Sequence, residues 1–221
     1  MNIRYLQYMS DLHLEKGFKR IIKASKPYLL LGGDIGNPNQ ENYKQFLHDM
    51  SSKFEKVFVL TGNHEYDNTQ QSELFKVEEK VKNICSMRNN LFYLQKNTHK
   101  ICDNENIYIA GCTFWAGLPK SKTIYHLEHI KWLTDTLKSN PQNNYIVATH
   151  HCPLYECLNI KYSQKTPNYF ASDQTNIIKL QNMIAWIYGH SHIHKDINIY
   201  GKWLVSNQYG SYPKPLYGFK N

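Results

Sequence analysis

Five short apolar runs, each followed by a small residue and then by Asp, Asn or His, constrain the fold of this 221-residue chain more than any other feature. The runs cover residues 3–9, 28–31, 57–60, 145–149 and 183–188. Apolar runs of this length are typical of strands buried on both faces of a parallel sheet. The polar residues that follow them are Asp11 and His13, Asp34, Asn63 and His64, His150, and His190 and His192. Because open α/β sheets bind ligands outside the carboxyl ends of their strands, we expect these side chains to surround one crevice.

Apolar residues at helical spacing predict helices between the runs. These expected helices cover residues 19–26, 40–53, 72–84, 124–138 and 175–182. The alternation of strand and helix in the first half of the chain predicts parallel βαβ units with right-handed crossovers. The residues alone therefore indicate a mixed α/β fold, and because no repeat or linker is visible we expect one domain over residues 1–221.

The middle of the chain has a different pattern. Three closely spaced strands are expected at residues 91–94, 98–102 and 107–112, and their short linkers favour antiparallel pairing. A final hairpin is expected from residues 196–200 and 203–207, around Gly201 and Lys202.

A cluster of histidines follows the last buried run. His190, His192 and His194 stand at alternate positions, and alternate side chains of an extended segment point to the same side. Histidine is the commonest protein ligand of transition metals. Together with carboxylates and an amide, the imidazoles suit Mn, Fe or Zn ions and not Ca²⁺, which takes oxygen ligands only. About seven candidate ligands are too many for one tetrahedral ion, whereas a pair of divalent ions would use them all.

Charge and cysteine content limit the partners and the compartment. The net charge of 26 − 18 = +8 would favour phosphate-bearing partners, but we prefer to explain it by a lysine-rich solvated surface. No run of five basic residues and no apolar stretch of membrane-spanning length occurs. Because no leader peptide is apparent and the five cysteines form an odd number, we expect a cytoplasmic protein with free thiols and no membrane association.

Five sequence motifs now point to a known family. In the family's order they are Ser10-Asp11-Leu12-His13, Gly33-Asp34-Ile35-Gly36, Gly62-Asn63-His64-Glu65, His150-His151-Cys152-Pro153 and Gly189-His190-Ser191-His192. The chain resembles the calcineurin-like metallophosphoesterases in these motifs, and in particular their small, stand-alone bacterial-type members. The resemblance implies a four-layer α/β/β/α sandwich of two mixed sheets flanked by helices.

The resemblance also implies a role for each motif residue. Asp11, His13 and His192 would bind the first metal ion, Asp34 would bridge both ions, and Asn63, His150 and His190 would bind the second. A hydroxide held between the ions would attack a phosphomonoester or phosphodiester. Asn63 would contact a phosphate oxygen, and His64 would serve as general acid or stabilise transition-state charge.

Other histidines and other functions remain as alternatives. His151 and Glu65 are expected beside the ligands, His194 on the surface or beside them, and His99, His126 and His129 in structural positions. Tyr155, Tyr162 and Lys165, in the loop after Pro153, are expected to influence substrate preference. A nucleic-acid-binding module without catalysis, and hydrolysis of a non-phosphate ester, are the alternative functions. The motifs are compatible with monoesters, diesters and cyclic nucleotides alike, and they predict no oligomeric state.

Overall fold

The computed structural model describes residues 3–17, 20–116, 123–158, 167–210 and 212–221. Its strands are β1 (Leu6–Met9), β2 (Tyr28–Gly32), β3 (Lys56–Leu60), β4 (Leu91–Tyr93), β5 (Asn97–Lys100), β6 (Ile107–Cys112), β7 (Asn144–Thr149), β8 (Met183–Ile187), β9 (Ile197–Ile199) and β10 (Lys202–Val205). Its α-helices are α1 (Glu41–Lys53), α2 (Leu74–Ser86), α3 (Thr123–Ser139), α5 (Pro167–Phe170) and α6 (Thr175–Ile178). Short 3₁₀ turns cover Leu14–Lys16, His64–Tyr66, Gln71–Glu73 and Tyr155–Cys157.

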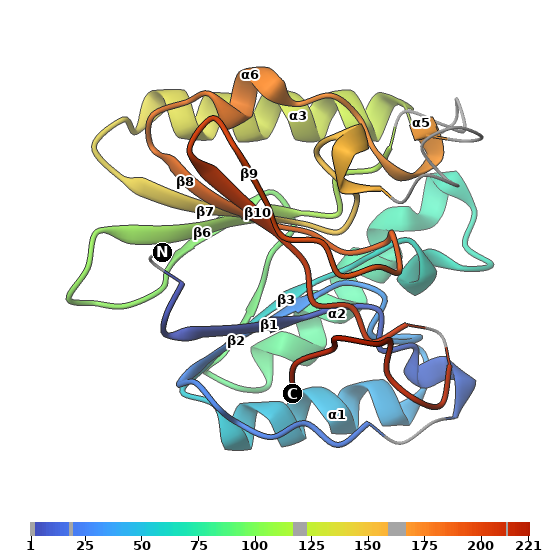
Figure 1. Ribbon diagram of the computed structural model, residues 1–221. Coiled ribbons are helices and arrows are strands. Elements are labelled where there is room, and N and C mark those ends of the chain that lie inside the picture. The colour runs from blue at the N-terminus through green and yellow to red at the C-terminus, as the bar shows by residue number, and fades with distance from the viewer. Residues whose placement is uncertain (1–2, 18–19, 117–122, 159–166, 211) are drawn as a thin grey trace.

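Two sheets pack face to face between helices (Figure 1). The first sheet has the order β1-β2-β3-β4 and is parallel throughout, whereas the second has the order β5-β6-β7-β8-β10-β9 with antiparallel strands at both edges. Helices α1 and α2 cover the first sheet, and α3 and α6 cover the second. The predicted α/β/β/α sandwich is confirmed, although only the second of its sheets is mixed.

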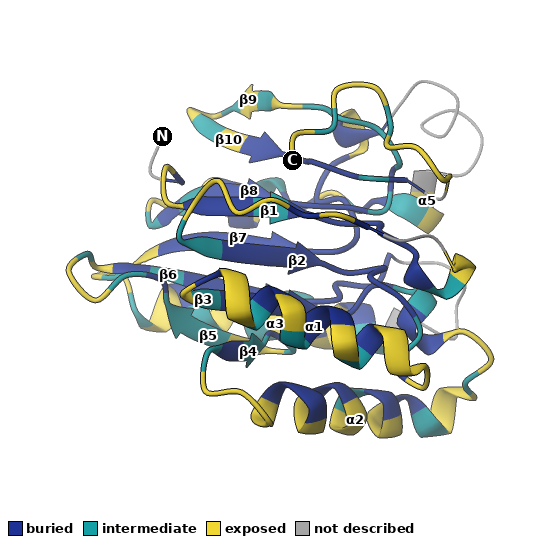
Figure 2. Cartoon of the chain, turned by 90° about the horizontal axis from the view of Figure 1, so that it is seen from below, coloured by how far each residue is buried: buried dark blue, intermediate teal, exposed yellow. Residues whose placement is uncertain are grey.

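Alternation along the central strands explains why both faces of each sheet are apolar. Leu29 and Leu31 pack toward α1, whereas Leu30 between them packs into the layer that separates the two sheets. In β7, Val147 packs toward α3, while Ile146 packs into the same central layer. Figure 2 shows the result: the central strands are largely buried, and α1 and α2 expose their outer faces. Such strands form a rigid frame from which loops leave at fixed positions.

The expected helix over residues 19–26 is wrong for the residues described there, because residues 20–25 form no helix. The backbone groups of this segment have other partners. Gln7 accepts a hydrogen bond from the Ser25 backbone N–H and donates one to the Lys23 carbonyl. Tertiary contacts therefore override a sequence of good helix formers.

The expected antiparallel pairing of the three middle strands is only partly right. Strand β4 pairs in parallel with β3 and completes the first sheet, whereas β5 pairs antiparallel with β6 in the second sheet. The short connection between β4 and β5 passes from one sheet to the other instead of forming a hairpin. The final hairpin of β9 and β10 is confirmed.

Candidate metal centre

Residues from both sheets form a first group of candidate ligands at the carboxyl ends of the strands. Asp11 and His13 follow β1, and His192 follows β8; together with Asp34 they present ligand atoms that all lie within 4.8 Å of one another. The Nε2 atom of His192 lies 3.1 Å from Asp11 Oδ1 and 3.4 Å from His13 Nε2. His13 and His192, which are 179 positions apart in the sequence, thus face the same point.

A second group shares one member with the first. Asp34, His150 and His190 also have ligand atoms within 4.8 Å of one another. The Nε2 atom of His150 lies 3.2 Å from Asp34 Oδ2 and 3.2 Å from the amide oxygen of Asn63. Asp34 belongs to both groups, so the two candidate sites are adjacent.

Two buried carboxylate oxygens test whether these residues fit metal ions. Asp11 Oδ1 and Asp34 Oδ2 have no hydrogen-bond partner among the described residues, although both side chains are almost fully buried. Each lies within 3.2 Å of a histidine nitrogen, which would pair with it as an ion only when that ring is protonated. A buried charge without a partner is expensive unless it is paired or coordinates a metal. The chemistry of the set, carboxylates with imidazoles and an amide oxygen, also suits a borderline divalent ion.

The hydrogen bonds of two histidines leave the correct nitrogen available. The Nδ1 atom of His13 lies 2.8 Å from Glu15 Oε1, and the Nδ1 atom of His150 lies 2.9 Å from the carbonyl oxygen of Gly32. A carboxylate or a carbonyl only accepts, so Nδ1 carries the proton in both rings. In the neutral form of each ring Nε2 then has a free lone pair, which is the arrangement of metal-binding histidines.

The backbone at the candidate ligands is strained. Positive φ angles occur at Asp11 (58°), His13 (51°), Asp34 (52°), His190 (68°) and His192 (50°). Non-glycine residues adopt this region rarely, and each such residue costs on the order of 1 kcal/mol or more. Strain of this kind gathers at functional sites, where the surrounding fold holds the backbone in place.

Two glycines allow the strand ends to approach closely. A Cβ atom at Gly33 would lie 2.6 Å from His150 Nδ1, and a Cβ atom at Gly62 would lie 2.2 Å from Asp34 Oδ1. Neither position has room for any other residue. Both glycines are therefore required by packing, and Gly33 is also required by its φ angle of 88°.

Glu65 binds the backbone of the neighbouring loops. It is buried, and its carboxylate accepts hydrogen bonds from the backbone N–H groups of Asp34 (3.0 Å), Ile35 (2.7 Å) and Gly62 (2.7 Å). Burial, reinforced by the charge of Asp34, raises the pKa of the Glu65 carboxyl to about 7. The sequence placed Glu65 beside the ligands, but it gave no indication that this carboxylate joins the two loops that follow β2 and β3.

His64 lies at the open side of the centre. Its backbone N–H donates to Asp34 Oδ1 (2.8 Å), and its ring Nδ1 lies 2.7 Å from Asp67 Oδ2. Its Nε2 atom lies 3.9 Å from Asp34 Oδ2, and 38% of the side chain is exposed. Burial alone would lower the pKa of the ring, but the Asp34 and Asp67 carboxylates outweigh it and raise that pKa.

The remaining histidines lie outside both groups of ligands. His151 is buried; the centroid of its ring lies 4.2 Å from that of His190, with the two rings tilted by 42°, and its Nδ1 is directed at the Thr113 carbonyl. His194 Nδ1 accepts the backbone N–H of Gln208. The expected extended segment over His190–His194 is therefore wrong, because the backbone turns at His190 and His192 and sends these rings to different groups.

Sequence reasoning missed the residues that support the ligands from a distance. Glu15, Arg20, Asp67 and Gln208 belong to none of the five motifs. Only Glu15 and Asp67 could have been found from the sequence, because Glu15 lies two residues after His13 and Asp67 lies three residues after His64. Tyr162 and Lys165, expected to influence substrate preference, lie outside the described residues, whereas Tyr155 is partly exposed and donates to Asn168.

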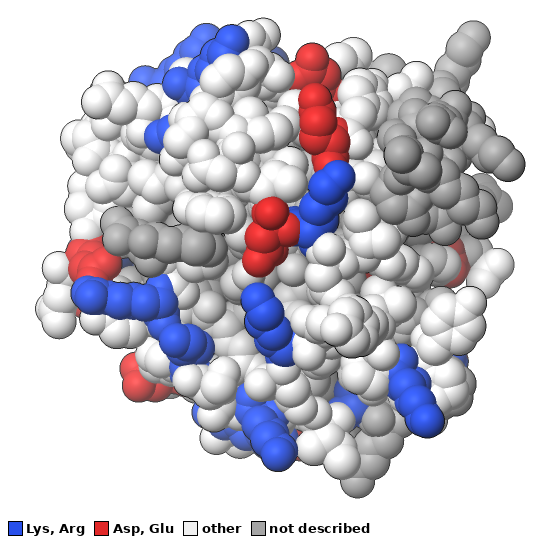
Figure 3. All heavy atoms as spheres, in the orientation of Figure 1, with Lys and Arg blue, Asp and Glu red and all other residues white. Residues whose placement is uncertain are grey.

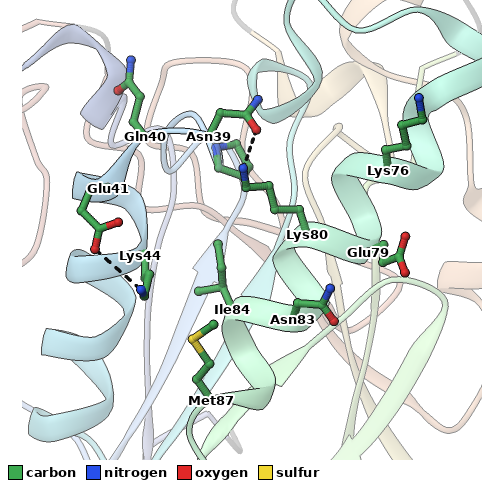
Figure 4. A pocket seen from close by; sticks show the side chains of 11 residues that line it. Asn39, Gln40, Glu41, Lys44, Lys76, Glu79, Lys80, Asn83, Ile84 and Met87 are labelled. Carbon is green, nitrogen blue, oxygen red and sulfur yellow. Dashed lines mark hydrogen bonds and ion pairs between the residues drawn. The ribbon is translucent and has the colours of Figure 1, made fainter.

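A groove between α1 and α2 bears on the nucleic-acid alternative (Figure 4). Its volume is about 390 Å³, and three lysines line it. Lys44 lies 3.7 Å from Glu41, Lys76 contacts Glu73, and Lys80 donates to Asn39. On the different face of the molecule that Figure 3 draws, Lys and Arg side chains are interspersed with acidic ones, with no continuous basic stripe among the residues described. Neither view favours a binding track for nucleic acid.

Buried carboxylates and imidazoles at the carboxyl ends of parallel strands define a metal-dependent hydrolase. The sequence profile of the family described as calcineurin-like phosphoesterase matches residues 8–194, so the chain belongs to that family. The predictions of the family and of metal-dependent phosphoesterase activity are thereby confirmed. In the part of the chain that the structure describes, no helix is long and apolar enough to cross a bilayer.

One relative is similar in sequence, and solved structures are similar in fold. The uncharacterized protein L509 of Acanthamoeba polyphaga mimivirus is 27% identical, over 94% of this chain and 91% of its own length. The phosphopantetheinyl hydrolase of Mycobacterium tuberculosis superposes with a TM-score of 0.71 at 15% identity, covering 95% of this chain and 90% of its own. A dimetal phosphatase from Danio rerio gives a TM-score of 0.54 at 10% identity, with coverages of 91% and 86%.

Proposed function

We propose that the chain is a dinuclear metal-dependent phosphoesterase that hydrolyses phosphomonoesters or phosphodiesters. The observation that supports this most strongly is the position of Asp34 in both groups of ligand atoms. A buried carboxylate shared by two clusters is suited to bridge two cations. The dimetal phosphatase from Danio rerio, which has the same fold, supports the proposal by analogy.

Each residue keeps the role that the motifs suggested. The first ion would be held by Asp11, His13 and His192, the second by Asn63, His150 and His190, and both by Asp34. Mn, Fe and Zn are the ions that suit this set. When bound, such a pair supplies positive charge to the phosphate and lowers the pKa of a water molecule that becomes the nucleophile.

The residues at the open side would assist the leaving group. Asp67 holds the Nδ1 proton of His64, so the opposite nitrogen, Nε2, faces the centre. In the charged ring Nε2 carries a proton that it donates to the leaving oxygen as the ester bond breaks. The Asn63 amide lies beside His150. From there its nitrogen would contact a phosphate oxygen and stabilise the developing charge.

We also propose a cellular compartment and a domain count for the chain. All five cysteines are free thiols, which supports a reducing compartment such as the cytoplasm. A bridge between Ser10 and Gln208 ties the first strand to the end of the chain, which supports a single domain over residues 1–221.

Chelation tests the proposed function directly. We expect a chelator to abolish hydrolysis of phosphomonoesters, phosphodiesters and cyclic nucleotides in a substrate panel, and Mn²⁺, Fe²⁺ or Zn²⁺ to restore it. Metal analysis of the restored enzyme should give two ions per chain. Activity that survives complete metal removal, or full activity with one ion per chain, would refute the dinuclear proposal.

His64→Ala tests the division between ligand and acid. We expect turnover to fall by about 10²-fold or more, the usual effect of losing a general acid, while the metal content stays at two ions. If the variant lost a metal ion instead, His64 would be a ligand. His48→Ala is the matched control, because His48 lies on α1 away from both groups.

A further inference from the structure

Gln208, near the end of the chain, connects the two sheets at the first group of ligands. Its side chain is fully buried, and its backbone forms a parallel bridge with Ser10. Around that bridge the Ser10 N–H donates to the Asn207 carbonyl (3.1 Å), and the Tyr209 N–H donates to the Ser10 carbonyl (2.9 Å). Gln208 is thereby fixed beside the residue that directly precedes Asp11.

All three side-chain hydrogen bonds of Gln208 go to the turn that carries His192. Its Oε1 accepts the backbone N–H of His192 at 2.5 Å. Its Nε2 donates to Ser191 Oγ and to the Ile193 carbonyl, both at 2.8 Å. The amide thus holds the residue before His192, the residue after it and His192 itself.

This turn requires outside support. His192 has a φ angle of 50°, and its ring faces Asp11 and His13, which belong to the opposite sheet. Backbone hydrogen bonds within one sheet cannot fix a distance between two sheets. The Gln208 amide does so, because it contacts the His192 turn while its backbone is bonded to Ser10.

We propose that Gln208 is a positioning residue that sets the separation of His192 from Asp11 and thereby the affinity of the first metal site. The proposal rests on the dinuclear function proposed above. Supporting residues of this kind typically contribute about 10–100-fold to metal affinity. Since Gln208 does not contact the second group, its loss should weaken one site selectively.

Gln208→Met tests this with little change in side-chain volume. In the metal-free chain we expect the His192 backbone N–H to exchange with solvent at least about tenfold faster, because its buried acceptor is lost. In Mn²⁺ titrations we expect the first site to weaken about 10–100-fold and the second to stay within about twofold. A parallel titration of His190→Asn, which lacks a ligand of the second group, identifies which site is which.

Gln7→Met is the matched control. Gln7 is also a buried glutamine with three side-chain hydrogen bonds, to Lys23 and Ser25, but it contacts neither group of ligands. We expect it to lower stability without changing His192 exchange or the first metal site. Gln208→Glu is the second variant, because its carboxylate still accepts the His192 N–H; it should keep His192 protected and retain the first site better than Met does.

Several outcomes would overturn the proposal. These are wild-type exchange of the His192 N–H in Gln208→Met, equal weakening of both sites, a first-site loss as large in Gln7→Met, or equal loss in the Glu and Met variants. If the wild-type chain itself bound fewer than two ions, the dinuclear function would fail instead. The exchange measurement would still show whether Gln208 holds the His192 turn.

Discussion

The two groups of candidate ligands are held in place by different means. In the second group, backbone packs directly against side chains, because Gly33 and Gly62 let their loops contact His150 and Asp34. The Glu65 carboxylate also accepts hydrogen bonds from the backbone N–H groups of Asp34, Ile35 and Gly62. The first group is joined across two sheets by side chains from outside the motifs. Gln208 holds the His192 turn, and Glu15 orients the His13 ring.

Arg20 adds a third such contact to the first group. Its Nε donates to the carbonyl of Leu12, between Asp11 and His13, while its other nitrogens donate to Tyr212 and Pro213 in the C-terminal segment. The comparison teaches that one site depends on close packing and the other on single, replaceable side chains. Substitutions of residues far away in sequence should therefore lower the metal affinity of the first site by small steps. Substitutions in the packed loops should lower that of the second site more abruptly.

Asp34→Asn removes the one residue that both groups share, so it should have the largest effect. We expect turnover to fall on the order of 10³-fold and both ions to bind more weakly, because the shared charge between them is lost. Mn²⁺ titration and steady-state kinetics measure this. Asp103→Asn, at an exposed carboxylate paired with Lys56, serves as the control. Weakening of only one site would show that the groups do not share Asp34.

Glu65→Gln should affect the second group more than the first. The amide nitrogen cannot accept the N–H groups of Asp34, Ile35 or Gly62, so at least one buried donor loses its partner. We expect the second site to lose about 10–100-fold in Mn²⁺ affinity and the first site to lose less. Glu41→Gln, at an exposed carboxylate on α1, is the control. A larger loss at the first site would reverse the comparison.

Arg20→Lys should give a smaller, graded effect confined to the first group. Lysine keeps the charge but not the planar fork that reaches three carbonyls. We expect about a tenfold loss of affinity at the first site, measured by the same titration. Arg4, like Arg20, lies over a tyrosine ring, but its side chain is exposed, so Arg4→Lys should change neither site.

The pH dependence of stability tests the fold apart from both groups of ligands. Burial lowers the pKa of His129 from 6.5 to about 3, so below pH 6.5 the unfolded chain binds a proton that the folded chain does not. Stability is then lost as pH falls, by about 2 kcal/mol between pH 7.5 and pH 5. His129→Gln, which keeps an acceptor for the Phe114 N–H, should flatten this loss in denaturant titrations of metal-free protein. An unchanged slope would show that His129 does not contribute.

The features that could be predicted from the sequence are those that a local pattern of residues encodes. Apolar runs with polar ends led to the parallel strands and to the side chains that meet at the centre, because a strand positions the residues at its end. The sequence could not show that β4 belongs to the first sheet, since a short linker is compatible with a hairpin or with a crossing between sheets. Nor could it predict Gln208 or Arg20, whose roles arise only where distant segments meet.

The positive φ angles at the ligands have a consequence for experiments. Asp, Asn and His tolerate this backbone region better than alanine does, so the residues that can coordinate a cation here are also those that can make the turn. An alanine scan of the centre would therefore mix two losses, coordination and chain geometry. Substituting Asn at Asp11, His13 or His192 would leave the turn largely undisturbed and report on coordination alone.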